Sequence, residues 1–99
     1  MLALFYYEGI DFEWNDEKAE RNWAKHRVTF MEAAKVFIDP HVQFIEDEGD
    51  YGEMRECAIG RINYSTTLYV VFVDLTTRFR IISARPATRA EIRQYEDDK

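Results

Sequence analysis

Hydrophobic positions follow a helical period in three parts of the chain. The first is residues 16–26, directly after Asn15, a residue type that often caps helix N-termini. The second is residues 28–39, which Pro40 terminates. Very few residues separate these two segments, so we expect a tight αα-hairpin. The predicted inner faces are Ala19, Trp23 and His26 in the first segment, and Phe30, Ala33, Ala34, Phe37 and Ile38 in the second.

The third helical segment begins near residue 88 and has Ile92 and Tyr95 on its inner face. A capping box, in which a Ser or Thr and a Glu three residues later satisfy each other's backbone N–H groups, supports two of the helix starts. The boxes are Thr29 with Glu32, and Thr88 with Glu91.

Strand patterns occupy most of the remaining chain. Residues 68–73 are almost continuously apolar, which is typical of a strand buried on both faces. Short connections at 63–67 and 74–78 predict antiparallel hairpins. The other strands are predicted at 42–45, 54–62 and 79–84, and at 3–7 and 10–14, which form one strand or two short strands around Gly9. The order β-α-α-β-β-β-β-α predicts an α+β fold, with an antiparallel sheet packed by an αα-hairpin and a C-terminal helix.

The composition is that of a folded protein. Of the 99 residues, 46% are hydrophobic and 15% aromatic, which predicts a single domain spanning 1–99. The one cysteine, Cys57, cannot pair within the chain, which favours a reducing compartment and a cytoplasmic location. No apolar run approaches the roughly 18 residues of a membrane helix. The first residues also lack the basic region of a signal peptide, so we expect no membrane association.

Charge is segregated along the sequence. The net charge is -6, yet residues 78–96 hold five of the nine arginines. Residues 8–20 and 46–56 each hold six acids and one base. This pattern allows a compact anion site together with acidic surfaces for a basic partner. The alternative is that the acids and arginines simply pair on the surface.

Strand alternation predicts where the arginines point. Arg78, Arg80 and Ile82 fall on one face of the last strand. Arginines within a sheet need an anionic partner, either a carboxylate or a phosphate of a ligand. On strand 54–62 the shared face holds Arg55, Cys57, Ile59 and Arg61, unless Gly60 introduces a bulge.

Near the third helix, the free N–H groups of the helix start and the side chains of Arg85 and Arg89 suggest a phosphate cradle. For Arg89 and Arg93 we favour pairing with acids of the chain, and for Arg61, Arg80 and Arg85 we favour a functional role.

Metal and nucleophile motifs are absent from the sequence: it has no CxxC, HExxH, P-loop or G-x-S-x-G pattern. His26 and His41 are too isolated to suggest a zinc site, and Cys57 is expected to be buried. We therefore expect neither a metal nor a cofactor. His26, in the last turn of its helix, either caps free carbonyls or acts as a general acid or base.

Four stretches together resemble the BrnT family, the toxins of BrnT–BrnA type II toxin–antitoxin systems. They are FEWNDEKAERNWAKHRVTFMEAAKVFIDP (12–40), the Y-G-E-x-R pattern within Asp47–Arg55, AIGR (58–61) and RIISARPATRAEIRQYE (80–96). The resemblance covers about residues 12–96. It implies a RelE-like fold, RNA cleavage that inhibits translation, and a BrnA-type antitoxin partner. That antitoxin carries the DNA-binding domain, so the operator DNA is bound through it.

The resemblance also implies site residues. The matching positions are Lys25, His26, Glu53, Arg55, Arg61, Arg80 and Arg85. One position departs from the family, which usually has glycine where this chain has Arg27. Glycine there would adopt a left-handed conformation after the helix, which costs arginine about 1 kcal/mol. Arg27 could instead contact RNA.

The resulting hypothesis is a metal-independent endoribonuclease, in which a ribose 2′-OH attacks the adjacent phosphate. His26 or Glu53 would act as the base. Arg61 and Arg80 would stabilise the charged phosphorane, and the RNA-binding residues would be Lys25, Arg27, Arg55 and Arg85. Two alternatives stay open: a catalytically degenerate toxin that serves its antitoxin as co-repressor, and a structural domain whose arginines only pair with its own acids.

Overall fold

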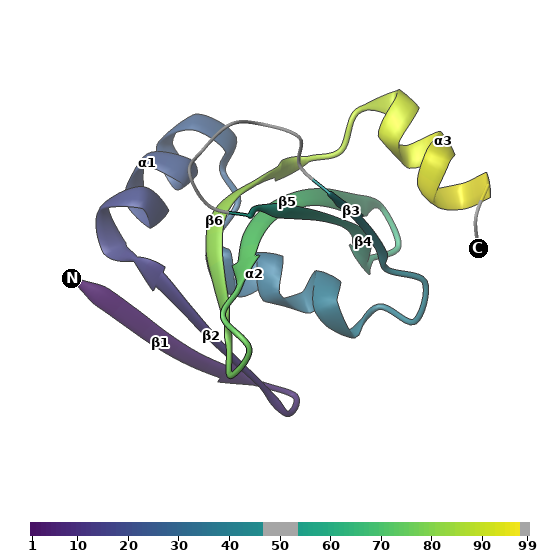
Figure 1. The fold of residues 1–99 in the computed structure, drawn as a ribbon. Coiled ribbons are helices and arrows are strands. Elements are labelled where there is room, and N and C mark those ends of the chain that lie inside the picture. The colour runs from purple at the N-terminus through teal and green to yellow at the C-terminus, as the bar shows by residue number, and fades with distance from the viewer. Residues whose placement is uncertain (47–53, 98–99) are drawn as a thin grey trace.

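The computed structural model describes residues 1–46 and 54–97, which form one six-stranded sheet with helices on both of its faces (Figure 1). The strand order is β1-β2-β6-β5-β4-β3. The strands are β1 Leu2–Tyr7, β2 Ile10–Asn15, β3 Gln43–Glu46, β4 Glu56–Asn63, β5 Thr66–Asp74 and β6 Phe79–Pro86. The helices are α1 Asp16–His26, α2 Phe30–Ala34, the 3-10 helix η1 Lys35–Ile38, and α3 Arg89–Asp97. The predicted α+β class is confirmed, and the predicted element order holds except that two strands, β1 and β2, precede α1.

The N-terminal segment forms two strands rather than one. The chain turns at Glu8 and Gly9, where both φ angles are positive, at 49° and 86°. β2 then pairs with β6 in parallel, with Phe12 opposite Phe79 and Glu13 opposite Arg80. The sequence predicted only antiparallel pairing, because hairpin lengths report on strands that are neighbours in sequence and β2 and β6 are not.

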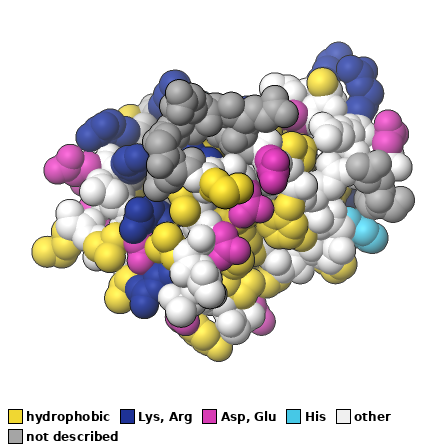
Figure 2. Space-filling model, in the orientation of Figure 1, with side chains coloured by type: hydrophobic (Ala, Val, Ile, Leu, Met, Phe, Trp, Pro, Cys, Tyr) yellow, Lys and Arg dark blue, Asp and Glu magenta, His cyan; other side chains and the backbone are white. Residues whose placement is uncertain are grey.

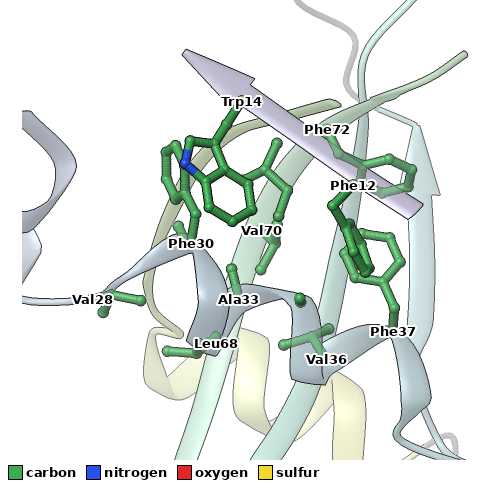
Figure 3. Packing of buried hydrophobic residues seen from close by; sticks show 14 residues of the cluster. Phe12, Trp14, Val28, Phe30, Ala33, Val36, Phe37, Leu68, Val70 and Phe72 are labelled. Carbon is green, nitrogen blue, oxygen red and sulfur yellow. The ribbon is translucent and has the colours of Figure 1, made fainter. Parts of the chain in front are cut away.

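The core lies between the sheet and the α2–η1 segment (Figure 3). Phe37 packs at its centre, with ring centroids 5.1 Å from Phe12 and 5.0 Å from Phe72. Burying one such side chain stabilises the fold by about 1.5–3 kcal/mol. The prediction that Ile38 faces the core is wrong, since it is 42% exposed and Val36 is fully buried instead. The cause is the tighter 3-10 turn, which changes the direction of each side chain from Lys35 onward.

Gly60 allows this segment to approach the sheet. A Cβ atom at residue 60 would lie 2.8 Å from the Cγ1 atom of Val36. The close approach also brings the Asp39 carboxylate to the backbone N–H of Arg61, at 2.7 Å. Gly60 therefore serves close packing rather than a bulge, and Arg61 stays on the face predicted for it.

α1 begins as predicted but presents a different residue to the core. The Asn15 side chain accepts a hydrogen bond from the backbone N–H of Lys18 at 3.1 Å. The prediction that Trp23 lies on the inner face is wrong: it is 44% exposed, and Asn22 is buried. The Asn22 amide donates to the carbonyls of Val28 and Ala84, at 3.0 and 2.8 Å. It also accepts from the Ala84 N–H at 3.0 Å, so its polar atoms are satisfied in the interior.

Arg27 adopts the left-handed conformation that was expected because the family usually has glycine at this position, with φ 56° and ψ 34°. Its N–H donates to the carbonyl of Trp23 at 2.9 Å and closes the helix. The Arg27 guanidinium lies 5.3 Å from the centroid of the Trp23 ring. A cation–π contact of this kind is worth about 0.5–1 kcal/mol at an exposed site, which offsets part of the backbone strain.

β6 contains a bulge. Phe72 pairs with Ile81 but Val71 pairs with Ser83, which leaves Ile82 as an extra residue. The predicted alternation therefore fails at Ile82, and Ser83 follows Arg80 on the face that points away from α2.

Candidate functional site

A cleft rich in cationic side chains lies between α1 and β6. One part has a volume of about 350 Å³ and is lined by Lys18, Arg21, Asn22, Lys25, His26, Ile82 and Ser83. An adjoining part of about 250 Å³ is lined by Leu2, Asn15, Lys18, Arg80, Ile81 and Ile82. The two parts share Lys18 and Ile82. We call the combined hollow, with its cations Lys18, Arg21, Lys25, His26 and Arg80, the basic cleft.

The helical repeat of α1 creates one wall of this cleft. Lys18, Arg21 and Lys25 are spaced i, i+3, i+7 and therefore project from one side of the helix. Asn22 lies beside them, and its hydrogen bonds to Ala84 fix α1 against β6. The positions of these cations relative to β6 are therefore set by buried contacts.

Charge in the cleft is only partly compensated. Arg21 lies 3.4 Å from Glu17, but both side chains are more than 70% exposed, so the pair contributes little. Within residues 1–46 and 54–97, no carboxylate forms an ion pair with Lys18 or Lys25. Figure 2 shows Lys and Arg side chains gathered on the side of the molecule that holds α1. The cleft thus offers positive charge to an anion, although the whole chain is acidic.

Arg80 is held in place by Glu13. Its Nε donates to Glu13 Oε2 at 2.9 Å, while Arg78 Nη1 lies 3.6 Å from Glu13 Oε1. The Glu13 side chain is 7% exposed and that of Arg80 is 41% exposed. The Nη atoms of Arg80 form no hydrogen bond with any residue that the structure describes. One carboxylate therefore orients two guanidinium groups and leaves the outer nitrogens of Arg80 available.

Arg85 lies farther along β6 and is engaged by α3. Its guanidinium makes two hydrogen bonds to the Glu91 carboxylate, at 2.8 and 2.9 Å, and lies 4.2 Å from the centroid of the Tyr69 ring. The hydrogen bonds between the two side chains lower the pKa of the Glu91 carboxyl group and raise the pKa of the Arg85 guanidinium. Glu91 also accepts from the N–H of Thr88 at 2.8 Å. The predicted capping box is confirmed, and its carboxylate occupies the place where a phosphate cradle was expected.

Arg61 is also held by α3. Its Nη2 lies 3.3 Å from Glu96 Oε1, and its guanidinium lies 6.0 Å from the centroid of the Tyr95 ring. Tyr95 is buried, as the sequence predicted, and its hydroxyl donates to Asp39 Oδ2 at 2.6 Å. Burial is the main cause, and this hydrogen bond the second, that raises the pKa of Tyr95 to about 12. Arg61 and Arg85 are thus part of the α3 docking surface, outside the basic cleft.

The structure therefore brings together only some of the predicted site residues. Lys25, His26 and Arg80 line the basic cleft, and Arg27 follows His26 at the end of α1. Arg55 precedes β4 and is half-buried. Glu53 lies outside the described residues. Arg89 and Arg93 are exposed and form no ion pair within the described part of the chain, so the pairing expected for them is not seen there.

Two cleft residues were missed from the sequence. Lys18 and Arg21, which line the cleft beside Lys25, were not predicted as site residues. The sequence signal for them was their helical spacing from Lys25. That spacing indicates a site only when the position of β6, the opposite wall of the cleft, is known.

Cys57 is buried as expected, and its Sγ accepts a hydrogen bond from the Tyr69 hydroxyl at 2.8 Å. In the described segments, no group of three or more His, Cys, Asp or Glu side chains is arranged to hold a metal ion.

Comparison with known proteins identifies the family. A family model described as the ribonuclease toxin, BrnT, of type II toxin–antitoxin systems matches residues 14–91. The chain belongs to the BrnT family. The match includes every cation of the basic cleft, whereas β1 precedes it. A comparison with curated proteins gives no match. None of the helices in the described part of this BrnT-family chain is long and apolar enough to cross a membrane.

A solved structure supports the fold. The 1.1 Å crystal structure of the Brucella abortus ribonuclease toxin BrnT is similar to this chain, with a TM-score of 0.61 and 24% sequence identity. The likeness covers 77% of this chain and 94% of that protein. The resemblance to BrnT seen in the sequence is thereby confirmed at the level of family and fold.

Proposed function

We propose that this BrnT-family toxin is an endoribonuclease that cleaves RNA in the basic cleft. The observation that supports this most directly is the convergence of Lys18, Lys25 and His26 from α1 with Arg80 from β6 on one hollow. A histidine beside several cations provides both a proton acceptor and stabilisation of phosphate charge. Such a local concentration of positive charge in a protein of net charge -6 suits a short segment of RNA rather than an extended duplex.

The proposed chemistry is an attack of the ribose 2′-OH on the adjacent phosphorus. His26 accepts the 2′ proton, the new O2′–P bond forms, and the P–O5′ bond breaks. The 5′ oxygen leaves with a proton from a general acid or water, and a 2′,3′-cyclic phosphate remains. Arg80 stabilises the charge of the phosphorane through its outer nitrogens. Glu53 is a second candidate for the base.

Other cations hold the phosphates on either side of the cleaved bond. Lys18, Arg21 and Lys25 line the cleft and are assigned to this role. Arg27 and Arg55 are proposed to extend the RNA path, as are Arg61 and Arg85. The last two would have to share or release the carboxylates of α3 in order to bind a phosphate.

Family membership supports a proposal for the wider role. We propose that RNA cleavage inhibits translation in the cytoplasm and requires no metal ion. We further propose that a BrnA-type antitoxin neutralises the toxin and binds the operator DNA on behalf of the complex.

Cleavage of an end-labelled RNA by the purified chain, with and without chelator, tests this function. We expect chelator-insensitive cleavage with a cyclic phosphate end. Arg80→Ala should lower kcat by about 10²–10³, the range for loss of one group that stabilises transition-state charge. Arg89→Ala, an exposed arginine on α3, is the matched control. Equal cleavage by wild type and by folded Arg80→Ala would contradict the assigned role.

One observation favours a second candidate, the catalytically inactive partner of an antitoxin. Arg61, Arg80 and Arg85 each pair with a carboxylate of the chain, namely Glu96, Glu13 and Glu91. Expression of the chain alone distinguishes the candidates: a ribonuclease arrests growth and depletes transcripts, whereas a binding module does neither.

A further inference from the structure

A second hollow lies on the other side of α1 and has the opposite charge. Its volume is about 420 Å³, and it lies between α1, the end of β2 and the start of α2. Its apolar residues include Trp14, Trp23, Phe30 and Met31, and its acids are Asp16 and Glu20. We call it the acidic groove.

The groove has a rigid floor and exposed apolar walls. Trp14 and Phe30 are buried and pack edge to face, with centroids 5.7 Å apart. Trp23 is 44% exposed and Met31 is 52% exposed. Large apolar side chains around a concave, well-packed floor are typical of sites that accept a side chain from a protein partner.

The rim of the groove carries two carboxylates, while the Arg27 guanidinium lies against the Trp23 ring at one wall. Asp16 and Glu20 are one helical turn apart and both exposed. Among the described residues, no Lys, Arg or His forms an ion pair with either carboxylate. An occupant must therefore combine an apolar side chain with positive charge.

We propose that the acidic groove binds a basic segment of the antitoxin. An aliphatic or aromatic side chain of that segment packs over Trp14 and Phe30, and a flanking Lys or Arg pairs with Asp16 or Glu20. The inference rests on the proposed function, which supplies the protein partner. RNA is a poor occupant because its phosphates would meet the two carboxylates, and a second copy of the chain is disfavoured by the net charge of -6.

The groove and the basic cleft use different sides of the same helix. Residues 16, 19, 20 and 23 line the groove, and residues 18, 21, 22 and 25 line the cleft. Both sets have the spacing i, i+3, i+4, i+7, which places the members of each set on one face of the helix. The second set starts two residues later, about half a turn around the helix, so the two sets lie on different faces. A substitution in the groove can therefore alter partner binding while the cations of the cleft stay in place.

The test measures affinity for a BrnA-type antitoxin, the partner proposed above, by titration calorimetry with the purified full-length proteins. Glu20→Lys reverses a rim charge and Met31→Ala removes apolar surface. Asp11→Lys makes the same charge change on the exposed β1–β2 hairpin and is the matched control. We expect Glu20→Lys to weaken binding at least about tenfold and Met31→Ala severalfold, with Asp11→Lys within about twofold of wild type. RNA cleavage without antitoxin should be equal in all four proteins.

Each other outcome is informative. Unchanged antitoxin affinity in Glu20→Lys and Met31→Ala, with wild-type cleavage of RNA, overturns the inference and leaves the proposed function intact. Weakened RNA binding with unchanged antitoxin affinity assigns the groove to RNA and also overturns it. Self-association that disappears in Glu20→Lys assigns the groove to a second copy. Failure of the wild type both to cleave RNA and to bind antitoxin removes the proposed function and this inference together.

Discussion

The Glu13 carboxylate accepts a hydrogen bond from the Nε of Arg80 at 2.9 Å, across a separation of 67 residues in the sequence. The two residues are also direct partners in the parallel pairing of β2 with β6. Glu13 contacts the Nε edge of the guanidinium, and Arg80 is one of the residues that line the basic cleft. Glu13 is therefore a positioning residue for Arg80.

Glu13→Gln should lower kcat by roughly tenfold without weakening RNA binding, because Arg80 keeps its charge but is oriented less firmly by a neutral side chain whose single oxygen must serve both Arg78 and Arg80. Replacing one carboxylate oxygen by an NH2 group beside two guanidinium groups should also lower the free energy of unfolding by about 1.5–3 kcal/mol. Steady-state kinetics and urea denaturation measure the two effects. Glu17→Gln, at an exposed pair with Arg21, should change both by little. A fall in affinity with unchanged kcat would contradict the positioning role.

Asn22→Ala should be one of the most destabilising single substitutions in α1. It removes three buried hydrogen bonds and leaves backbone groups of Val28 and Ala84 without partners. The expected loss is about 2–4 kcal/mol, since each unsatisfied buried group costs about 1–3 kcal/mol. Urea unfolding of Asn22→Ala beside Glu20→Ala, an exposed neighbour, gives the comparison. A difference below about 0.5 kcal/mol would show that α1 is not fixed by this side chain.

Two substitutions at residue 27 distinguish the cost of backbone strain from the loss of the side-chain contact with Trp23. Arg27→Ala loses the contact with the Trp23 ring and keeps the left-handed backbone. Arg27→Gly loses the same contact but adopts this backbone without strain. Arg27→Gly should therefore be more stable than Arg27→Ala by about 1 kcal/mol. Thermal unfolding of the two variants measures the difference, and equal stabilities would be inconsistent with a strained cap.

The pair of Arg85 and Glu91 makes part of the stability dependent on pH. Hydrogen bonding to Arg85 lowers the pKa of Glu91 from its ordinary 4.5 in the folded state. The ionised pair therefore stabilises the fold above the unfolded pKa, and this stabilisation is lost as the pH falls through the lowered folded pKa. Wild type should exceed Glu91→Gln in stability at pH 6, and the difference should shrink as the pH falls below about 4.5. A difference that stays constant from pH 6 to acidic pH would exclude this pair as its source.

Lys18, which sequence reasoning overlooked, should contribute to RNA affinity through charge. Lys18→Ala should weaken binding and reduce the salt dependence of log K by about 0.7, the amount for one contact to a single-stranded phosphate. Lys35→Ala, on η1 and outside the cleft, should leave the slope unchanged. Filter binding over a series of salt concentrations measures both slopes. Equal slopes for Lys18→Ala and wild type would place Lys18 outside the RNA contact.

Local signals in the sequence predicted most of the secondary structure. The caps at Asn15 and Thr29 and the turn at Gly9 act over a few residues, so they could be recognised without the fold. The burial of Asn22 could not be predicted, because it depends on a hydrogen bond to Ala84, 62 residues away. The parallel β2–β6 pairing was missed for the same reason.

The candidate site was predicted in part. Lys25, His26 and Arg80 were identified and meet in one cleft, but their joint position depends on how α1 packs beside β6. Arg61 and Arg85 were grouped with them because sequence shows charge but not which carboxylate faces it. The docking of α3 assigns Glu96 and Glu91 to these two arginines.

The bulge at Ile82 determines which side chains of β6 point to the same face of the sheet. Arg80 and Arg85 are an odd number of positions apart, so in an unbroken strand they would point to opposite faces of the sheet. The extra residue makes the separation effectively even and turns both toward the same side, while Ile81 and Ala84 both reach the core. If Ile82 were instead paired in a regular ladder, the residues after it would exchange inside for outside: Arg85 would be driven toward the core and α3 would lose the arginine that anchors it.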